Sequence, residues 1–162
     1  MNDKIAIVGL GYVGIPLAIE FGKQYNTIGY DLNKKRIENL NQSIDNVTGI
    51  TQSEFKKSSK LVFSSKLSDL RKCNIYIIAV PTPIDKNNNP DLKILFDATS
   101  DIGTIISKND IVIYESTVYP GCTEEDCVPI LENKSKLKFN EDFYCGYSPE
   151  RINPGDKDKT LT

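Results

Sequence analysis

Gly9-Leu10-Gly11-Tyr12-Val13-Gly14 is the stretch that decides the fold of this chain. Its glycines have the spacing G-x-G-x-x-G, and they join an apolar run at residues 4–9 to an amphipathic segment at residues 12–23. Asp31 follows 22 residues after Gly9, at the end of the next apolar run. An acidic residue at this distance is typical of a dinucleotide-binding unit. The context favours such a unit over the alternative, a glycine-rich turn without a ligand.

Each glycine has a distinct physical task in a unit of this kind. Gly9 permits the tight turn, Gly11 lets the backbone approach a pyrophosphate, and Gly14 allows helix and strand to pack closely. The free amides at the start of the helix then face the phosphates. Asp31 is expected to accept hydrogen bonds from the adenosine ribose and to repel a 2′-phosphate, although it could be an ordinary solvated acid. The predicted cofactor is therefore NAD rather than NADP.

Short apolar runs alternate with longer amphipathic segments along the chain. This alternation is typical of parallel strands that are buried on both faces and joined by crossover helices. We predict an α/β fold: a doubly wound, Rossmann-type, mostly parallel sheet of about six strands with helices on both faces. Residues 1–150 would form one NAD-binding domain, and residues 151–162 would begin a linker toward a portion absent from this chain. The strands are expected at residues 4–9, 27–31, 61–64, 74–80, 110–115 and 143–147.

Several helix starts can be predicted from capping residues. Asn33 should cap the second helix, and Asp91 is a good N-cap for the helix that follows the fourth strand. Residues 123–126 resemble a capping box, and Pro129 should kink the helix behind them. Residues 44–59 are polar and are expected to form a loop with a short helix.

Charge and hydropathy exclude two classes of partner. The net charge is −2, with 20 basic and 22 acidic residues interspersed, so no basic stripe is present to hold nucleic acid. The longest apolar run, residues 75–80, is too short to cross a bilayer. The N-terminus lacks the pattern of a signal peptide. A cytoplasmic location is therefore expected.

The sequence contains no histidine, which excludes any histidine-dependent mechanism. The four cysteines, at positions 73, 122, 127 and 145, lack the paired C-x-x-C spacing of zinc sites, so no metal is expected. They are predicted to be reduced and mostly buried.

Polar residues follow three of the predicted strands: Thr82, residues 115–117 and residues 148–151. Because ligands bind at the carboxyl ends of strands in a doubly wound sheet, these loops should open on the same edge as the glycine turn. Simpler roles are possible for each. Thr82 could satisfy its own turn, Thr117 could mark a helix entry, and Glu150 with Arg151 could be a solvated surface pair.

Four stretches together resemble the UDP-glucose/GDP-mannose dehydrogenase family. They are Gly-Leu-Gly-Tyr-Val-Gly-Ile-Pro-Leu-Ala (9–18), Val-Pro-Thr-Pro (80–83), Glu-Ser-Thr-Val-Tyr-Pro-Gly (115–121) and Tyr-Ser-Pro-Glu-Arg-Ile-Asn-Pro-Gly-Asp (147–156). The Ser-Pro-Glu-Arg form is similar to the branch that oxidises UDP-N-acetylhexosamines. This branch includes the galactosamine and mannosamine enzymes of capsule, O-antigen and Vi-type polysaccharide synthesis.

The resemblance implies a four-electron oxidation, in which the sugar C6 alcohol passes through an aldehyde and a cysteine thioester to a carboxylate while two NAD are reduced. Contacts with NAD are implied for Tyr12, Val13, Asp31, Arg36, Thr82 and Thr117, beside the turn residues Gly9, Leu10, Gly11 and Gly14. Thr117 would also help to hold the catalytic water, and Glu150 would act in acid–base chemistry. Glu150, Arg151 and Ile152 would contact the UDP-sugar, and the full-length protein would be a homodimer.

The chain departs from the family in its length. Members are more than twice as long, and their nucleophilic cysteine, catalytic lysine and UDP-binding domain lie beyond position 162. We therefore expect a cofactor-binding domain that binds NAD without completing catalysis. Two alternatives remain: a stand-alone NAD-binding or redox-sensing module, and another bidomain dehydrogenase of the β-hydroxyacid type.

Overall fold

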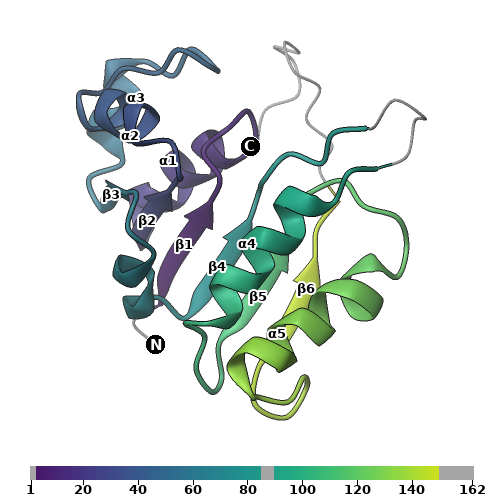
Figure 1. Ribbon diagram of the computed structural model, residues 1–162. Coiled ribbons are helices and arrows are strands. Elements are labelled where there is room, and N and C mark those ends of the chain that lie inside the picture. Colours follow the sequence, from purple (N-terminus) through teal and green to yellow (C-terminus); the bar gives the residue numbers. More distant parts are fainter. Residues whose placement is uncertain (1–2, 85–89, 150–162) are drawn as a thin grey trace.

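The computed structural model describes residues 3–84 and 90–149, which form a parallel sheet with helices on both faces (Figure 1). The strand order is β3-β2-β1-β4-β5-β6, and every neighbouring pair is parallel. The strands are β1 (Lys4–Val8), β2 (Asn26–Tyr30), β3 (Leu61–Ser64), β4 (Ile75–Ile78), β5 (Ile111–Tyr114) and β6 (Tyr144–Tyr147). The predicted α/β doubly wound fold is confirmed. The order reverses between β1 and β4, which is where such sheets bind ligands.

Two apolar layers enclose the sheet because successive side chains of a strand point to opposite faces. Ala6 and Val8 of β1 pack in the layer that contains α4 and α5, whereas Ile5 and Ile7 pack in the layer that contains α1 and α2. In Figure 1, α4 and α5 lie in front of the sheet. The helices are α1 (Gly14–Gln24), α2 (Lys34–Asn41), α3 (Gln52–Lys57), α4 (Lys93–Gly103) and α5 (Val128–Ser135), with a 3₁₀ turn η1 (Leu67–Lys72) and a π-helical turn η2 (Thr123–Cys127).

The structure confirms one predicted cap and corrects two. Asn33 caps α2, because its side chain accepts a 3.1 Å hydrogen bond from the Arg36 amide. The expectation for Asp91 is wrong: Leu92 is the N-cap of α4, and the Asp91 carboxylate accepts from the Lys93 amide at 3.0 Å. Thr123 forms no capping box, since it lies inside η2, where the backbone continues helically from Cys122.

A capping box that was not predicted from the sequence occurs at the start of α3. Thr51 and Glu54 cap α3 reciprocally, each side chain accepting from the other's amide. The predicted short helix in residues 44–59 is therefore present. Pro129 lies near the start of α5, directly behind the π-helical turn. In this first turn of a helix proline is tolerated, so the kink predicted for Pro129 stays a prediction.

All four cysteines are free thiols in packed surroundings, as predicted. Cys73, Cys122 and Cys127 are buried, and Cys145 is half-buried. Burial raises the pKa of the Cys73 thiol to about 11 and the pKa values of Cys127 and Cys145 to about 12. These thiols are therefore protonated at neutral pH and are poor nucleophiles. Within residues 3–84 and 90–149, no group of three or more cysteine and acidic side chains is arranged to hold a metal ion.

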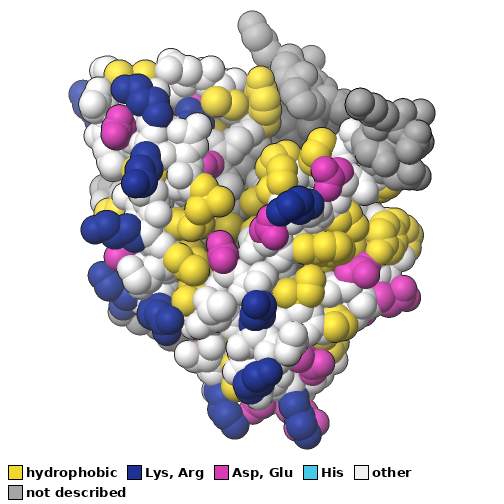
Figure 2. All heavy atoms as spheres, in the orientation of Figure 1, with side chains coloured by type: hydrophobic (Ala, Val, Ile, Leu, Met, Phe, Trp, Pro, Cys, Tyr) yellow, Lys and Arg dark blue, Asp and Glu magenta, His cyan; other side chains and the backbone are white. Residues whose placement is uncertain are grey.

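The visible surface carries both signs of charge. Figure 2 shows lysine and arginine side chains interspersed with acidic ones on the face that bears α4, with hydrophobic side chains gathered near its centre. Among the described residues, none of the helices has the length and apolar character needed to cross a membrane.

Candidate cofactor site

The glycine turn after β1 has the geometry that its sequence predicts. Gly9 has a φ of +93°, and a Cβ there would lie 2.9 Å from the carbonyl oxygen of Ala79. A Cβ on Gly14 would lie 1.8 Å from the carbonyl oxygen of Gly9, so only glycine allows α1 to start this close to the strand. A Cβ on Gly11 would meet no atom within 4 Å. Gly11 is thus not required for packing, and the space beside it is open to a ligand.

Asp31 ties the end of β2 to this turn. One carboxylate oxygen accepts a 2.9 Å hydrogen bond from the Leu10 amide, and the other accepts a 2.8 Å bond from the Asn33 amide. The Gly9 amide donates to the Tyr30 carbonyl at 2.9 Å, which fixes the same junction from the backbone. Each carboxylate oxygen keeps acceptor capacity beyond its single amide partner. Asp31 is therefore oriented by the turn and still able to accept hydrogen bonds from ribose hydroxyls.

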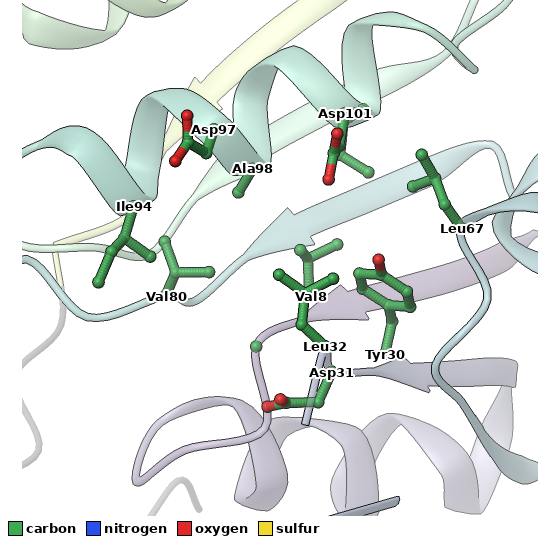
Figure 3. Close-up of a pocket in the computed structure, with 12 residues that line it drawn as sticks. Val8, Tyr30, Asp31, Leu32, Leu67, Val80, Ile94, Asp97, Ala98 and Asp101 are labelled. Atoms are coloured by element: carbon green, nitrogen blue, oxygen red, sulfur yellow. The ribbon is translucent and has the colours of Figure 1, made fainter. Parts of the chain in front are cut away.

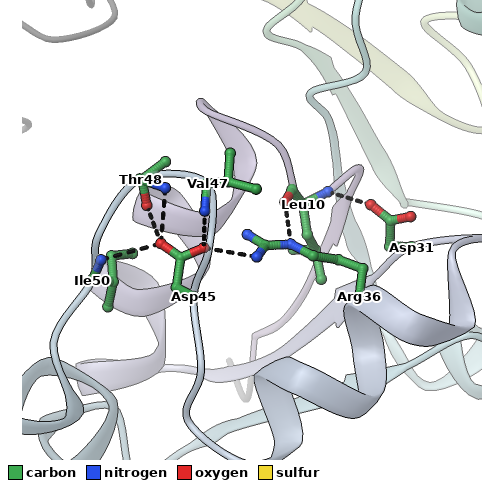
Figure 4. Close-up of polar contacts among 7 residues, drawn as sticks. All are labelled: Leu10, Asp31, Arg36, Asp45, Val47, Thr48 and Ile50. Atoms are coloured by element: carbon green, nitrogen blue, oxygen red, sulfur yellow. Dashed lines mark hydrogen bonds and ion pairs between the residues drawn. The ribbon is translucent and has the colours of Figure 1, made fainter.

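Arg36 lies beneath the turn and is 91% buried, with only 9% of its side chain exposed. Its Nε donates to the Leu10 carbonyl at 3.1 Å, and its Nη1 pairs with Asp45 at 2.7 Å (Figure 4). The remaining nitrogen, Nη2, is buried and has no hydrogen-bond partner within the described part of the chain. A buried donor without a partner is costly. An acceptor supplied by a bound dinucleotide would remove this cost.

A cleft of about 240 Å³ opens between the ends of β1 and β2 and helix α4 (Figure 3). Its walls are mainly apolar, with Leu32 on the side of Asp31 and Ile94 on the side of α4. Asp31 lies at one end, and Asp97 and Asp101 line the α4 side. Apolar walls suit a flat aromatic base, and the acidic rim disfavours an additional phosphate. The apolar lining and the acidic rim of the cleft therefore suit an adenosine group without a 2′-phosphate.

Tyr30 forms part of the floor of this cleft. Burial raises the pKa of its phenol, and the charges of Asp101 and Asp31 raise it further. The phenol therefore remains neutral at physiological pH, and it adds no charge to the acidic rim.

The loops after β4 and β5 meet at the same edge of the sheet. The Thr82 hydroxyl donates to the Thr117 carbonyl at 2.8 Å, and the buried Ser116 hydroxyl donates to the Val80 carbonyl at 2.7 Å. Thr82 thus bonds to the neighbouring loop and not to its own turn. The Ser148 amide donates to the Tyr114 carbonyl at 2.9 Å, so the segment after β6 starts at this edge too. The side chains predicted for this edge at Glu150, Arg151 and Ile152 lie outside the described residues, as does the predicted linker at 151–162.

Sequence reasoning missed one residue of the site, Asp45. It lies in the polar segment 44–59, whose fold the sequence left open, and it proves to be the partner of Arg36. An available signal was the spacing to Val47 and Thr48, because an aspartate commonly accepts from the amides two and three residues ahead.

A turn with open space at Gly11, an oriented acid, and a buried arginine nitrogen without a partner fit a bound dinucleotide. With the strand order, they define an NAD-binding Rossmann domain of a dehydrogenase. The family model described as the UDP-glucose/GDP-mannose dehydrogenase family, NAD binding domain, matches residues 3–161, and the chain belongs to this family. NAD is its cofactor.

Relatives with known names agree with this assignment. The chain is 59% identical to a UDP-N-acetyl-D-glucosamine 6-dehydrogenase of Pseudomonas aeruginosa, covering 100% of this chain and 39% of the relative. It is 55% identical to the enzyme of the same name from Salmonella typhi, covering 98% and 37%. Among solved structures, a UDP-D-ManNAc dehydrogenase from Pyrococcus horikoshii aligns with a TM-score of 0.87 at 34% identity, over 94% of this chain and 37% of that one.

Proposed function

We propose that this chain supplies the NAD-binding part of an enzyme that oxidises the C6 alcohol of a UDP-N-acetylhexosamine to a carboxylate. The observation that carries the proposal is the glycine turn with its oriented Asp31 and buried Arg36, in a chain 59% identical to a named UDP-N-acetyl-D-glucosamine 6-dehydrogenase. The resemblance drawn from the motifs named the galactosamine and mannosamine enzymes. The relatives at 59% and 55% identity favour the glucosamine epimer as substrate.

The number of electrons removed and the oxygen atom added define what the site of the proposed reaction must supply. Oxidation of a primary alcohol to a carboxylate removes four electrons, so two NAD are reduced for each sugar, and one water provides the second oxygen. NAD, when bound, accepts the hydride from C6. Thr82 and Thr117 lie at the edge of the sheet that would face the nicotinamide end. We assign to Thr117 a part in holding the water.

Three residues after β6 complete the proposed set. Glu150 would provide acid–base catalysis during thioester hydrolysis, and Glu150, Arg151 and Ile152 would contact the sugar nucleotide. This assignment rests on the Ser-Pro-Glu-Arg motif. The four cysteines of this chain lie in packed surroundings, and burial raises the thiol pKa of Cys73, Cys127 and Cys145. None is therefore assigned as the nucleophile of the thioester step.

The chain spans 39% and 37% of the length of the two relatives reported above. We propose that residues corresponding to the rest of those relatives supply the nucleophilic cysteine and most of the UDP contacts, in a homodimer. The 162-residue chain alone should then bind NAD but form no NADH with any UDP-sugar.

A chimera tests the proposal. Residues 1–162 replace the matching N-terminal 39% of the Pseudomonas aeruginosa relative, and the parent relative serves as the control. The expected result is two NADH per UDP-N-acetylglucosamine, with slower turnover of UDP-glucose. A folded chimera that binds NAD but fails to oxidise the sugar would contradict the proposal. NADH formation by the 162-residue chain alone would contradict the assignment of the nucleophile.

A further inference from the structure

We propose that Asp45 is a positioning residue for the cofactor site and that it strengthens the preference for NAD over NADP by fixing the guanidinium of Arg36. Asp45 belongs to the loop between α2 and α3, outside the cleft itself. The inference rests on NAD binding at the glycine turn and does not depend on which sugar is oxidised.

The loop is built around the Asp45 carboxylate, which is 0% exposed. The amides of Val47, Thr48 and Ile50 donate to it at 3.1, 3.0 and 3.1 Å, and the Thr48 hydroxyl donates as well (Figure 4). A buried carboxylate with this many donors is held in one orientation. Asp45 therefore presents a fixed negative charge to Arg36.

The carboxylate also stays ionised. Burial acts to raise its pKa, but the hydrogen bonds from Thr48, Arg36 and the amides of Ile50 and Val47 outweigh burial and hold the pKa well below its usual range. At neutral pH, Arg36 and Asp45 thus form a complete ion pair.

Arg36 is fixed from two sides as a result. Its Nη1 is held by Asp45 at 2.7 Å and its Nε by the Leu10 carbonyl at 3.1 Å. Because the guanidinium is planar and rigid, two such anchors fix the plane and leave Nη2 as its free nitrogen in the described structure. The Leu10 amide in turn donates to Asp31 at 2.9 Å. A continuous set of polar contacts therefore connects the loop at residues 45–50 to the acid that selects the ribose.

The fixed position of the Arg36 guanidinium affects the preference between NAD and NADP. An arginine close to the ribose-binding acid is the side chain that accommodates the 2′-phosphate in NADP-binding domains. Arg36 lies one residue's contacts away from Asp31, since it donates to the carbonyl of Leu10 and the amide of Leu10 donates to Asp31. However, its charge is neutralised by Asp45, and turning it toward a 2′-phosphate would break both anchors and leave Asp45 buried without a cation. Asp45 thus adds a second obstacle to NADP beyond the repulsion by Asp31.

The test compares the dissociation constants of NAD and NADP by calorimetric titration of the 162-residue chain and its variants. Asp45→Asn removes the charge and frees Arg36, so the ratio of the NADP constant to the NAD constant should fall about tenfold. In an Arg36→Met background, Asp45→Asn should change this ratio by less than about twofold. Glu54→Gln is the matched control, because it removes one acidic charge from the same segment without contacting Arg36. It should leave the ratio unchanged.

Two results would overturn the inference. One is an equal weakening of NAD and NADP in Asp45→Asn, which indicates a structural role only. The other is the same shift of the ratio with Met at position 36, which indicates a general charge effect. If Asp45→Asn shows no cooperative thermal transition, Thr48→Val replaces it, because this change loosens the carboxylate while keeping both charges. The ratio should then fall about twofold, and an unchanged ratio would count against the proposal. Failure of the parent chain to bind NAD would refute the cofactor site itself.

Discussion

The hydroxyl of Thr82 donates a 2.8 Å hydrogen bond to the main-chain carbonyl of Thr117, 35 residues further along the chain. The bond joins the loops after β4 and β5, and its acceptor is a backbone atom. Replacing the side chain of Thr117 therefore leaves the bond intact, whereas replacing the side chain of Thr82 removes it.

This asymmetry gives the first prediction. Thr82→Val should lower the free energy of unfolding by about 1 kcal/mol, the usual net value of one hydrogen bond. Thr117→Ala should change it by less than about 0.5 kcal/mol, as expected for an exposed side chain outside the bond. Urea denaturation of both variants measures the difference. Equal losses would show that the bond does not contribute to stability.

The second prediction separates the roles of two glycines. Gly11→Val should abolish NAD binding and leave the urea midpoint close to that of the parent, because the added atoms enter open space where a pyrophosphate would lie. Gly14→Ala is the contrasting variant. Its Cβ would lie 1.8 Å from the Gly9 carbonyl oxygen, so it should destabilise the fold by several kcal/mol, about 3 or more. Normal NAD binding by a folded Gly11→Val protein would rule out the phosphate-binding role.

Asp31 provides the third prediction. Asp31→Ala should weaken NAD binding by about 1–3 kcal/mol and weaken NADP binding less, because the repulsion of the 2′-phosphate disappears with the charge. Asp31→Asn separates the two effects, since it removes the charge but keeps an acceptor for the Leu10 amide. It should lose less NAD affinity than Asp31→Ala. Titration of both cofactors is the measurement, and a parent chain that binds NAD and NADP equally would contradict the role of Asp31.

The fourth prediction concerns acid stability. Because the pKa of Asp45 is lowered in the folded state, its contribution to stability is fully present above its unfolded pKa of about 4 and is lost as the pH falls through the folded value. Asp45→Asn should therefore cost about 3 kcal/mol at pH 7, as expected when a buried ion pair loses one partner. The difference between variant and parent should shrink below pH 4. Urea denaturation between pH 2 and pH 7 tests this, and a difference that is constant with pH would contradict it.

The fifth prediction applies to the chimera with the longer relative. Glu150→Gln should slow thioester hydrolysis about 100-fold or more, the scale expected for a positioned acid–base group, and should let a covalent sugar–enzyme adduct accumulate. Thr117→Ala should produce a similar but smaller defect, because it loosens the water without removing the base. Intact mass measured after mixing with UDP-sugar and NAD detects the adduct. Unimpaired turnover with Gln at position 150 would show that the acid–base group lies elsewhere.

The sheet could be predicted from the sequence because buried parallel strands are short, apolar and separated by amphipathic helices, and the glycine turn fixes where the first strand ends. Caps were harder to predict. Asn33 was correct, but Asp91 is one residue too early, because its carboxylate bonds to the Lys93 amide while Leu92 takes the cap position. Thr123 has the composition of a cap, yet the chain is already helical at Cys122. Local composition does not reveal the backbone conformation that precedes a residue.

The residues of the candidate site also differ in how far the sequence could predict them. Asp31 was predictable because its distance from the turn is set by the length of one helix and one strand. Asp45 was not, because its partner Arg36 is reached through a loop whose course depends on four hydrogen bonds to a single carboxylate. A charged residue in a polar segment looks solvated in a sequence. It becomes a buried anchor only when the tertiary structure brings a guanidinium to it.

The strand order places the residues near Asp31 and the loops after β4 and β5 on opposite sides of β1. Asp31, at the cleft, and the ion pair of Arg36 and Asp45 behind it come from segments that follow β2, whereas Thr82 and Thr117 follow β4 and β5 on the other side of β1. The two sets share the edge of the sheet but no loop. We therefore expect substitutions between residues 31 and 50 to change the cofactor preference while the loops after β4 and β5 keep their geometry. In this strand order, the residues proposed to select the cofactor and the loops proposed to face the sugar lie in separate segments, so evolution or design can alter one set without the other.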